Sequence, residues 1–127
     1  MSTDFTETEH AVLCWLATSD AQNRPNVSPK EIYAQIGETQ LVIADIASAR
    51  SVRNIRANPA VCVSLIDVFL QRGRKLEGHA EIIAPDDPDF SQLAAPLLAM
   101  TGDTFESAMS YRSASNAAPA FWHPAIW

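Results

Sequence analysis

The chain has 127 residues, of which 47% are hydrophobic, and this predicts one globular domain over residues 1–127. Its formal net charge of −6 argues against a nucleic-acid-binding surface, and no apolar run is long enough to span a membrane. The two cysteines lie within apolar runs, which is typical of buried free thiols, and no Cys/His spacing indicates a metal site. The N-terminus lacks a signal-peptide pattern, so we expect a soluble cytoplasmic protein.

The first third of the chain predicts a short helix and three strands. We expect the helix at Thr6–His10 and the strands at Val12–Ser19, Pro25–Gln35 and Gln40–Asp45, with polar turns at Asp20–Asn23 and Gly37–Glu38. Pro29 indicates that the second strand is an edge or irregular strand. Alternation along that strand places Val27, Pro29, Glu31 and Tyr33 on one face and Asn26, Ser28, Lys30 and Ile32 on the other.

The segment Ser48–Pro59 predicts a short helix. Ser48 is a good N-cap, and Pro59 marks the end. Helical spacing places Val52 and Ile55 on an inward face, with Arg50, Arg53 and Asn54 on the opposite face. Serines and an arginine at a helix N-terminus favour binding of a phosphate, because the helix dipole, the free N–H groups and the guanidinium attract anions. The simpler interpretation is a solvated basic face.

The remaining chain predicts two more strands and a second helix. We expect a strand buried on both faces at Val61–Val68, a polar turn at Gln71–Arg74 and an alternating strand at Lys75–Ile83. Asp87 and Pro88 begin a helix that has an apolar side at Leu93, Leu97 and Leu98 and a kink or break near Pro96. Strands joined by short turns favour a mainly β fold with short helices, an antiparallel, Greek-key-like barrel.

Isolated polar residues leave alternatives open. Lys30 is more simply a solvent-facing lysine, although it would suit a cation facing a ligand. Asp45 fits a turn or cap, and Arg72, Arg74 and Lys75 fit a soluble hairpin tip. His79 fits a half-buried strand residue, and no catalytic grouping with the other histidines is indicated.

Three segments resemble the FMN-binding split-barrel family related to pyridoxamine 5′-phosphate oxidase. They are Leu16–Asp20 with Arg24–Lys30, Leu41–Asp45 with Ser48–Pro59, and Lys75–Glu81, which together cover roughly residues 12–84. Each motif is loose alone, whereas their order and spacing together are fairly specific.

The resemblance implies a homodimer that binds two FMN molecules at its interface. The implied phosphate-binding residues are Ser48, Arg50, Ser51, Arg53 and Asn54; those near the isoalloxazine ring are Val27, Ser28, Pro29, Lys30, Ala44 and Asp45. Ser51 stands where the family commonly has Lys or Arg, so one phosphate-binding charge is missing. The C-terminal Arg/His motifs that grip a pyridoxal substrate are also missing, which disfavours a true pyridoxamine-phosphate oxidase.

Family members usually close the barrel with a last strand after the second helix. Residues Phe105–Trp127 instead lack strand alternation, so we predict that this tail forms no regular central strand. We interpret the protein as an FMN-dependent oxidoreductase with an unknown small-molecule substrate. The alternatives are a non-catalytic module that binds or senses flavin, and the same barrel holding a deazaflavin or haem.

Overall fold

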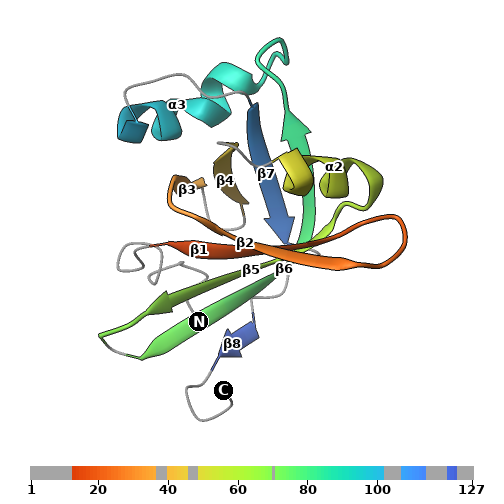
Figure 1. The fold of residues 1–127 in the computed structure, drawn as a ribbon. Helices are drawn as coiled ribbons and strands as arrows, with labels where there is room; N and C mark the ends of the chain where they lie inside the picture. Colours follow the sequence, from red (N-terminus) through yellow and green to blue (C-terminus); the bar gives the residue numbers. More distant parts are fainter. Residues whose placement is uncertain are drawn as a thin grey trace.

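The computed structural model describes residues 13–36, 40–45, 49–69, 71–101, 107–113 and 120–122. This part of the chain forms a mainly antiparallel β structure with two helices (Figure 1). The elements are β1 (Cys14–Ser19), β2 (Pro25–Lys30), β3 (Tyr33–Ile36), β4 (Gln40–Asp45), α2 (Ala49–Ala57), β5 (Ala60–Asp67), β6 (Arg72–Ile83), α3 (Phe90–Thr101), β7 (Ser107–Ser113) and β8 (Ala120–Trp122). The predicted helix at Thr6–His10, the turn at Gly37–Glu38 and the cap at Ser48 lie outside the described residues.

The strands follow the order β2-β1-β5-β6-β7-β4-β3, and β8 pairs with β6. Strands β2 and β3 are consecutive in the chain, yet they lie at the two ends of this order, so the sheet stays open as in a split barrel. Helix α2 contacts β1 and β6, whereas α3 contacts β3, β4 and β7 (Figure 1). The predicted split β-barrel is therefore confirmed.

Strand β4 separates two apolar clusters. Leu41 and Ile43 belong to the cluster that Ile55 of α2 completes, whereas Val42 and Ala44 belong to the cluster under Leu97 of α3. The strand buried on both faces is therefore β4. The prediction of two buried faces for Val61–Val68 was wrong, because buried and half-buried residues alternate along β5.

The predicted strand Pro25–Gln35 is in fact two strands. Strand β2 pairs with β1 and ends at Lys30, and β3 pairs with β4 and begins at Tyr33. The backbone N–H of Ala44 donates to the carbonyl of Ile32 at 3.0 Å, so the chain has already reached β4 at that point. The break resets the alternation, and Tyr33 is buried although Val27 is exposed. The expectation that Pro29 marks an edge strand is confirmed, since β2 lies at one end of the sheet.

The prediction for the tail was wrong. Strand β7 lies between β6 and β4, in the middle of the sheet, and β8 pairs with β6. Ala108 and Ser110 are buried small residues, so β7 carries no strong hydrophobic alternation. Its position depends on backbone pairing with β6 along one edge and with β4 along the other. Gln40 Nε2 of β4 also donates a hydrogen bond to Ser110 Oγ at 2.7 Å.

The ends of two further elements differ from the sequence prediction. Strand β6 begins at Arg72 instead of Lys75, because Arg72 pairs with Asp67 across the hairpin. Helix α3 begins at Phe90 and continues past Pro96 without a break. Asp89 serves as its cap residue, since its carbonyl accepts the N–H of Leu93 at 3.0 Å.

Candidate functional site

Two side-chain hydrogen bonds hold helix α2 against the β1–β2 hairpin. Asn54 Nδ2 donates to Thr18 Oγ1 at 3.0 Å, and Ser28 Oγ lies 3.2 Å from Ser51 Oγ. Thr18, Ser51 and Asn54 are buried. The placement of Asn54 on the exposed face was therefore wrong. Residues three apart on a helix share a face, so Asn54 shares one with Ser51, and both point at the polar side chains of the hairpin.

A basic groove lies between the β1–β2 turn and α2. It has a volume of about 520 Å³ and is lined by Asp20, Ala21, Gln22, Arg24, Arg50, Arg53, Asn54 and Ala57. Arg50 and Arg53 are exposed, as predicted, and the fold brings them to one hollow. The third guanidinium, that of Arg24, was not assigned to the site from sequence. The sequence feature that could have indicated Arg24 is its position as the first residue of the segment Arg24–Lys30, which resembles the family.

The turn that carries Arg24 is fixed by Asp20. Asp20 Oδ2 accepts from Arg24 Nε at 2.7 Å, and Asp20 Oδ1 accepts from the backbone N–H groups of Gln22 at 2.8 Å and Arg24 at 2.9 Å. These bonds, with that from the Arg24 backbone foremost, lower the pKa of Asp20. Asn23, the last residue of the predicted polar turn, has a φ of 62°, a left-handed conformation that Asn tolerates.

A smaller hollow surrounds Lys30. It has a volume of about 210 Å³ and is lined by Pro29, Lys30, Glu31, Ile32 and Ala44. We call it the Lys30 pocket. Lys30 is only 7% exposed, so its interpretation as a solvent-facing lysine was wrong. The side chain turns inward because Lys30 pairs with buried Cys14 and the two residues share a face of the hairpin.

Burial and nearby charges set the protonation of this pocket. Desolvation lowers the pKa of Lys30, and the Asp45 carboxylate opposes this shift. Burial raises the pKa of Cys14 to about 12 despite the attraction of Lys30, so this thiol is a poor nucleophile. The pocket therefore offers one buried amine, balanced by a buried carboxylate.

The remaining candidate residues for the flavin ring differ in whether they line a hollow. Ala44 lines the Lys30 pocket, and Asp45 is buried at the end of β4. Ser28 lines neither hollow, and its Oγ contacts Ser51 Oγ of α2. Val27 is exposed, lies on the opposite face of β2 from Ser28 and Lys30, and lines neither hollow.

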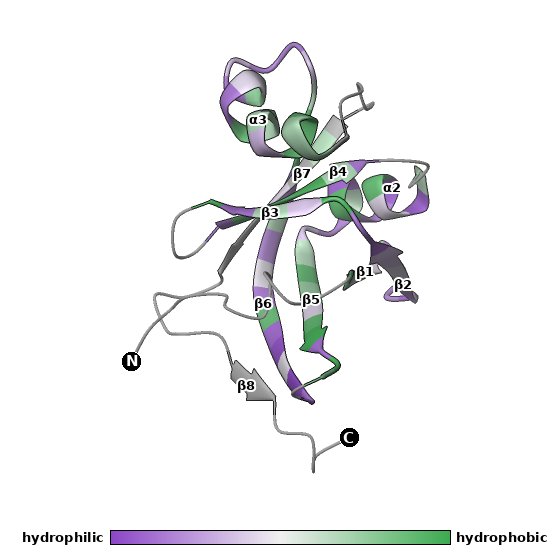
Figure 2. Cartoon of the chain, turned by 90° about the vertical axis from the view of Figure 1, so that its left-hand side faces the viewer, coloured by the Kyte–Doolittle hydropathy of each residue, from purple (hydrophilic) through white to green (hydrophobic). Residues whose placement is uncertain are grey.

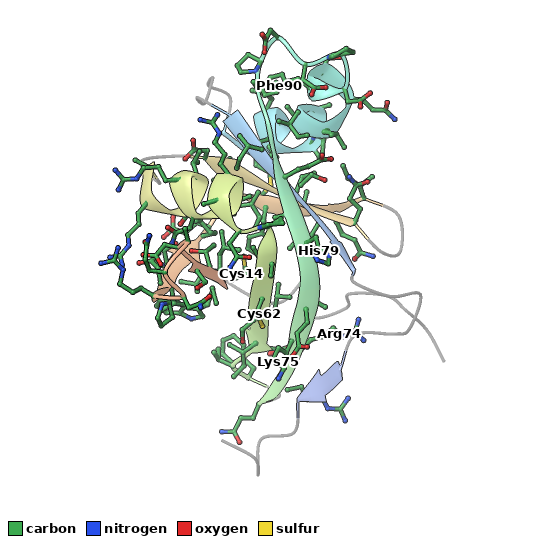
Figure 3. The ribbon with its side chains drawn as sticks, turned by 90° about the vertical axis from the view of Figure 1, so that its right-hand side faces the viewer. Cys14, Cys62, Arg74, Lys75, His79 and Phe90 are labelled. Atoms are coloured by element: carbon green, nitrogen blue, oxygen red, sulfur yellow. The ribbon has the colours of Figure 1, made fainter. Side chains whose placement is uncertain are left out.

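Other candidates, among those labelled in Figure 3, line neither hollow. Cys14 is a buried free thiol, as predicted, whereas Cys62 is only half-buried. Arg74 is buried and does not belong to a solvated tip, and His79 is exposed and not half-buried. No group of His, Cys, Asp and Glu suited to a metal ion occurs among the described residues. Neither described helix is both long and apolar enough to cross a bilayer.

Known structures share this fold. The haem storage protein HutZ from Vibrio cholerae superposes with a TM-score of 0.71 at 21% identity, covering 95% of this chain and 97% of that one. An FMN-binding protein from Syntrophomonas wolfei gives a TM-score of 0.65 at 11% identity, with 91% and 80% covered. An F420 reductase gives 0.62 at 24% identity, with 88% and 95% covered.

No curated protein sequence matches the chain significantly. A family model does: the model described as pyridoxamine 5′-phosphate oxidase matches residues 4–122, nearly the whole sequence. The three sequence segments and the split barrel lie within this range. The chain therefore belongs to the pyridoxamine 5′-phosphate oxidase family.

Proposed function

We propose that the protein binds FMN, with the phosphate in the basic groove and the isoalloxazine ring toward the Lys30 pocket, and that it acts as an oxidoreductase. The observation that carries this proposal is the convergence of Arg24, Arg50 and Arg53 on one groove of a chain whose net charge is −6. Guanidinium groups bind phosphate through paired, charge-assisted hydrogen bonds. FMN-binding relatives of the same fold support the choice of cofactor.

The phosphate end of the site uses α2. Arg50 and Arg53 supply charge on the exposed side of the helix. Ser51 already contacts Ser28, and Asn54 already donates to Thr18. Ser51 and Asn54 therefore act by fixing the helix, and Arg24, whose Nε already donates to Asp20, offers its other guanidinium N–H groups.

The ring end of the site uses β2 and β4. Ser28 and Pro29 present backbone to the ring, Ala44 leaves space beside it, and Lys30 places a buried positive charge near it. Bound FMN supplies the redox chemistry. The Lys30 amine would lie near the bound ring, and the Asp45 carboxylate opposes the lowering of the Lys30 pKa by burial.

We also propose that the protein forms a homodimer. The outer face of β1 and β2 exposes Trp15 and Val27, and apolar surface of this kind commonly marks a contact between copies. Light scattering at micromolar concentration should report twice the mass of the chain. A monomer would contradict this part of the proposal.

An absorption spectrum of the protein as purified tests the cofactor. Flavin bands support the proposal. A deazaflavin band would instead indicate F420, and a Soret band would indicate haem, the cofactors named for two structural neighbours. Titration with FMN and riboflavin then tests the phosphate site, since only FMN carries the anion. Reduction of the bound flavin by NADH or NADPH distinguishes an enzyme from a module that only binds flavin.

A further inference from the structure

Lys30 is a buried amine beside a small hollow. The residue is only 7% exposed, and it lines the Lys30 pocket. Its neighbours in the pocket wall include Pro29, Ile32 and Ala44. Strand β4, which is hydrophobic over most of its length (Figure 2), supplies Ala44 and ends at buried Asp45. In such surroundings the ammonium form of a lysine loses much of the water that would otherwise stabilise it.

The other lysine of the chain has the opposite environment. Lys30 and Lys75 are the two lysines of the sequence. Lys75 lies on β6, its side chain is 47% exposed, and its Nζ pairs with Glu77 Oε1 at 3.2 Å. Lys75 is therefore solvated and ion-paired, whereas Lys30 is enclosed. The chain thus contains its own reference for the reactivity of the buried amine.

Burial and three neighbouring groups set the charge of Lys30 and its pocket. Burial lowers the pKa of Lys30 and is the largest effect, whereas Asp45 on β4 and Cys14 on β1 act in the opposite direction. Exposed Glu31 adds a further carboxylate at the pocket wall. Because the net change in pKa is downward, Lys30 is neutral more often than a solvated lysine at the same pH. A desolvated, neutral lysine amine is a nucleophile towards carbonyl carbon.

The size and charge of the pocket limit which carbonyl compound it accepts. The pocket has a volume of about 210 Å³, and at about 30 Å³ per molecule of liquid water it holds about seven non-hydrogen atoms. Once Lys30 is neutral, the carboxylates of Asp45 and Glu31 leave negative charge around the pocket, which repels an anionic keto acid. A small neutral aldehyde satisfies both limits.

We propose that Lys30 condenses reversibly with a small neutral aldehyde in the Lys30 pocket. The nitrogen lone pair forms a bond to the aldehyde carbon, the two hydrogens of the amine leave with the carbonyl oxygen as water, and an imine remains. No electrons are transferred, so the step needs no oxidant or reductant. This activity goes beyond FMN binding, because it uses a side chain of the protein itself, and either proposal can fail without the other.

Reductive trapping of the protein as purified tests the amine. Propanal and cyanoborohydride are added at pH 7, where cyanoborohydride reduces any imine to a stable propyl-lysine. Peptide mapping then measures the rate of modification at Lys30 and at Lys75. We expect Lys30 to react at least about fivefold faster than Lys75, although it is the less exposed of the two. Equal rates, or a faster reaction at Lys75, would overturn the proposal.

The pH dependence of the same ratio separates a reactive amine from simple access. Raising the pH makes a solvated lysine amine neutral as well. The preference of propanal for Lys30 over Lys75 should therefore shrink between pH 7 and pH 10. A preference that stays constant over this range would show that access to the pocket alone sets the labelling, and would contradict the proposal.

The choice of a neutral aldehyde is tested with glyoxylate, an aldehyde that carries a carboxylate. The ratio of modification at Lys30 to that at Lys75 should be lower with glyoxylate than with propanal, and Glu31→Gln should reduce this difference about threefold. Glu81→Gln is the matched control, because Glu81 is exposed on β6 and does not line the Lys30 pocket. No change with Glu31→Gln, or an equal change with Glu81→Gln, would contradict charge selection by the pocket.

Discussion

The two helices are attached to the same sheet by different interactions. Helix α2 is held by Ile55 on the core and by the polar contacts Asn54–Thr18 and Ser51–Ser28. Helix α3 is held by Leu97 and other apolar residues over the second cluster. Polar contacts fix direction and register, because a hydrogen bond has a preferred geometry, whereas apolar contacts mainly supply stability. The helix with the directional contacts is also the one that carries the basic groove.

The largest expected effect is on stability at α3. Leu97→Ala removes a fully buried side chain and should lower the free energy of unfolding by about 2–5 kcal/mol. FMN affinity of the folded fraction should stay unchanged, because Leu97 lines neither hollow. Denaturant unfolding and FMN titration check this. A matching loss of FMN affinity would show that α3 supports the site.

The opposite combination, a loss of FMN affinity with little change in stability, is expected for the exposed arginines of α2. Replacing Arg50 and Arg53 together with Gln should weaken FMN binding at least tenfold (about 1.4 kcal/mol or more), with little change in stability. Riboflavin should bind both proteins equally, since it lacks the phosphate. Fluorescence titration at low and high salt should show a larger loss at low salt. Equal losses for both ligands would mean that the arginines support the ring pocket or the fold instead.

An intermediate effect is expected at the polar contacts of α2. Thr18→Val removes the acceptor for buried Asn54 and should lower stability by about 1–3 kcal/mol. Because the helix loses orientation, FMN affinity should fall while riboflavin affinity changes less. Thr18→Ser retains the hydroxyl and is the matched control. If neither affinity falls, the contact supports stability alone; if both fall equally, it supports the whole pocket and not the phosphate end.

The smallest effect is a pH dependence at the β1–β2 turn. The folded-state pKa of Asp20 is lowered, so its contribution to stability is present above the ordinary pKa of 3.8 and is lost as pH falls through the folded value. Asp20→Asn should therefore lower the urea midpoint slightly at pH 7, and the difference should shrink at acid pH. Urea unfolding of both proteins over this range measures it. A difference that grows on acidification would contradict the assigned sign.

The sequence alone identified several elements because their signals are local. The bounds of β4 and the helix after it follow from a short apolar run and from helical spacing before Pro59. The arginines of α2 were recognised as a candidate anion site for the same reason, since their helical positions are set by spacing. Family motifs added the split barrel, which the family match and the fold confirm.

Only the tertiary structure decided the features that depend on residues far apart in the chain. Strand β7 takes its central place because β6 and β4 offer backbone hydrogen bonds on both sides, which small residues such as Ala108 do not reveal in sequence. Lys30 turns inward because it pairs with buried Cys14 of β1, and Arg24 joins Arg50 and Arg53 because the β1–β2 turn lies beside α2. Local periodicity specifies which residues share a face, whereas long-range pairing specifies what each face meets.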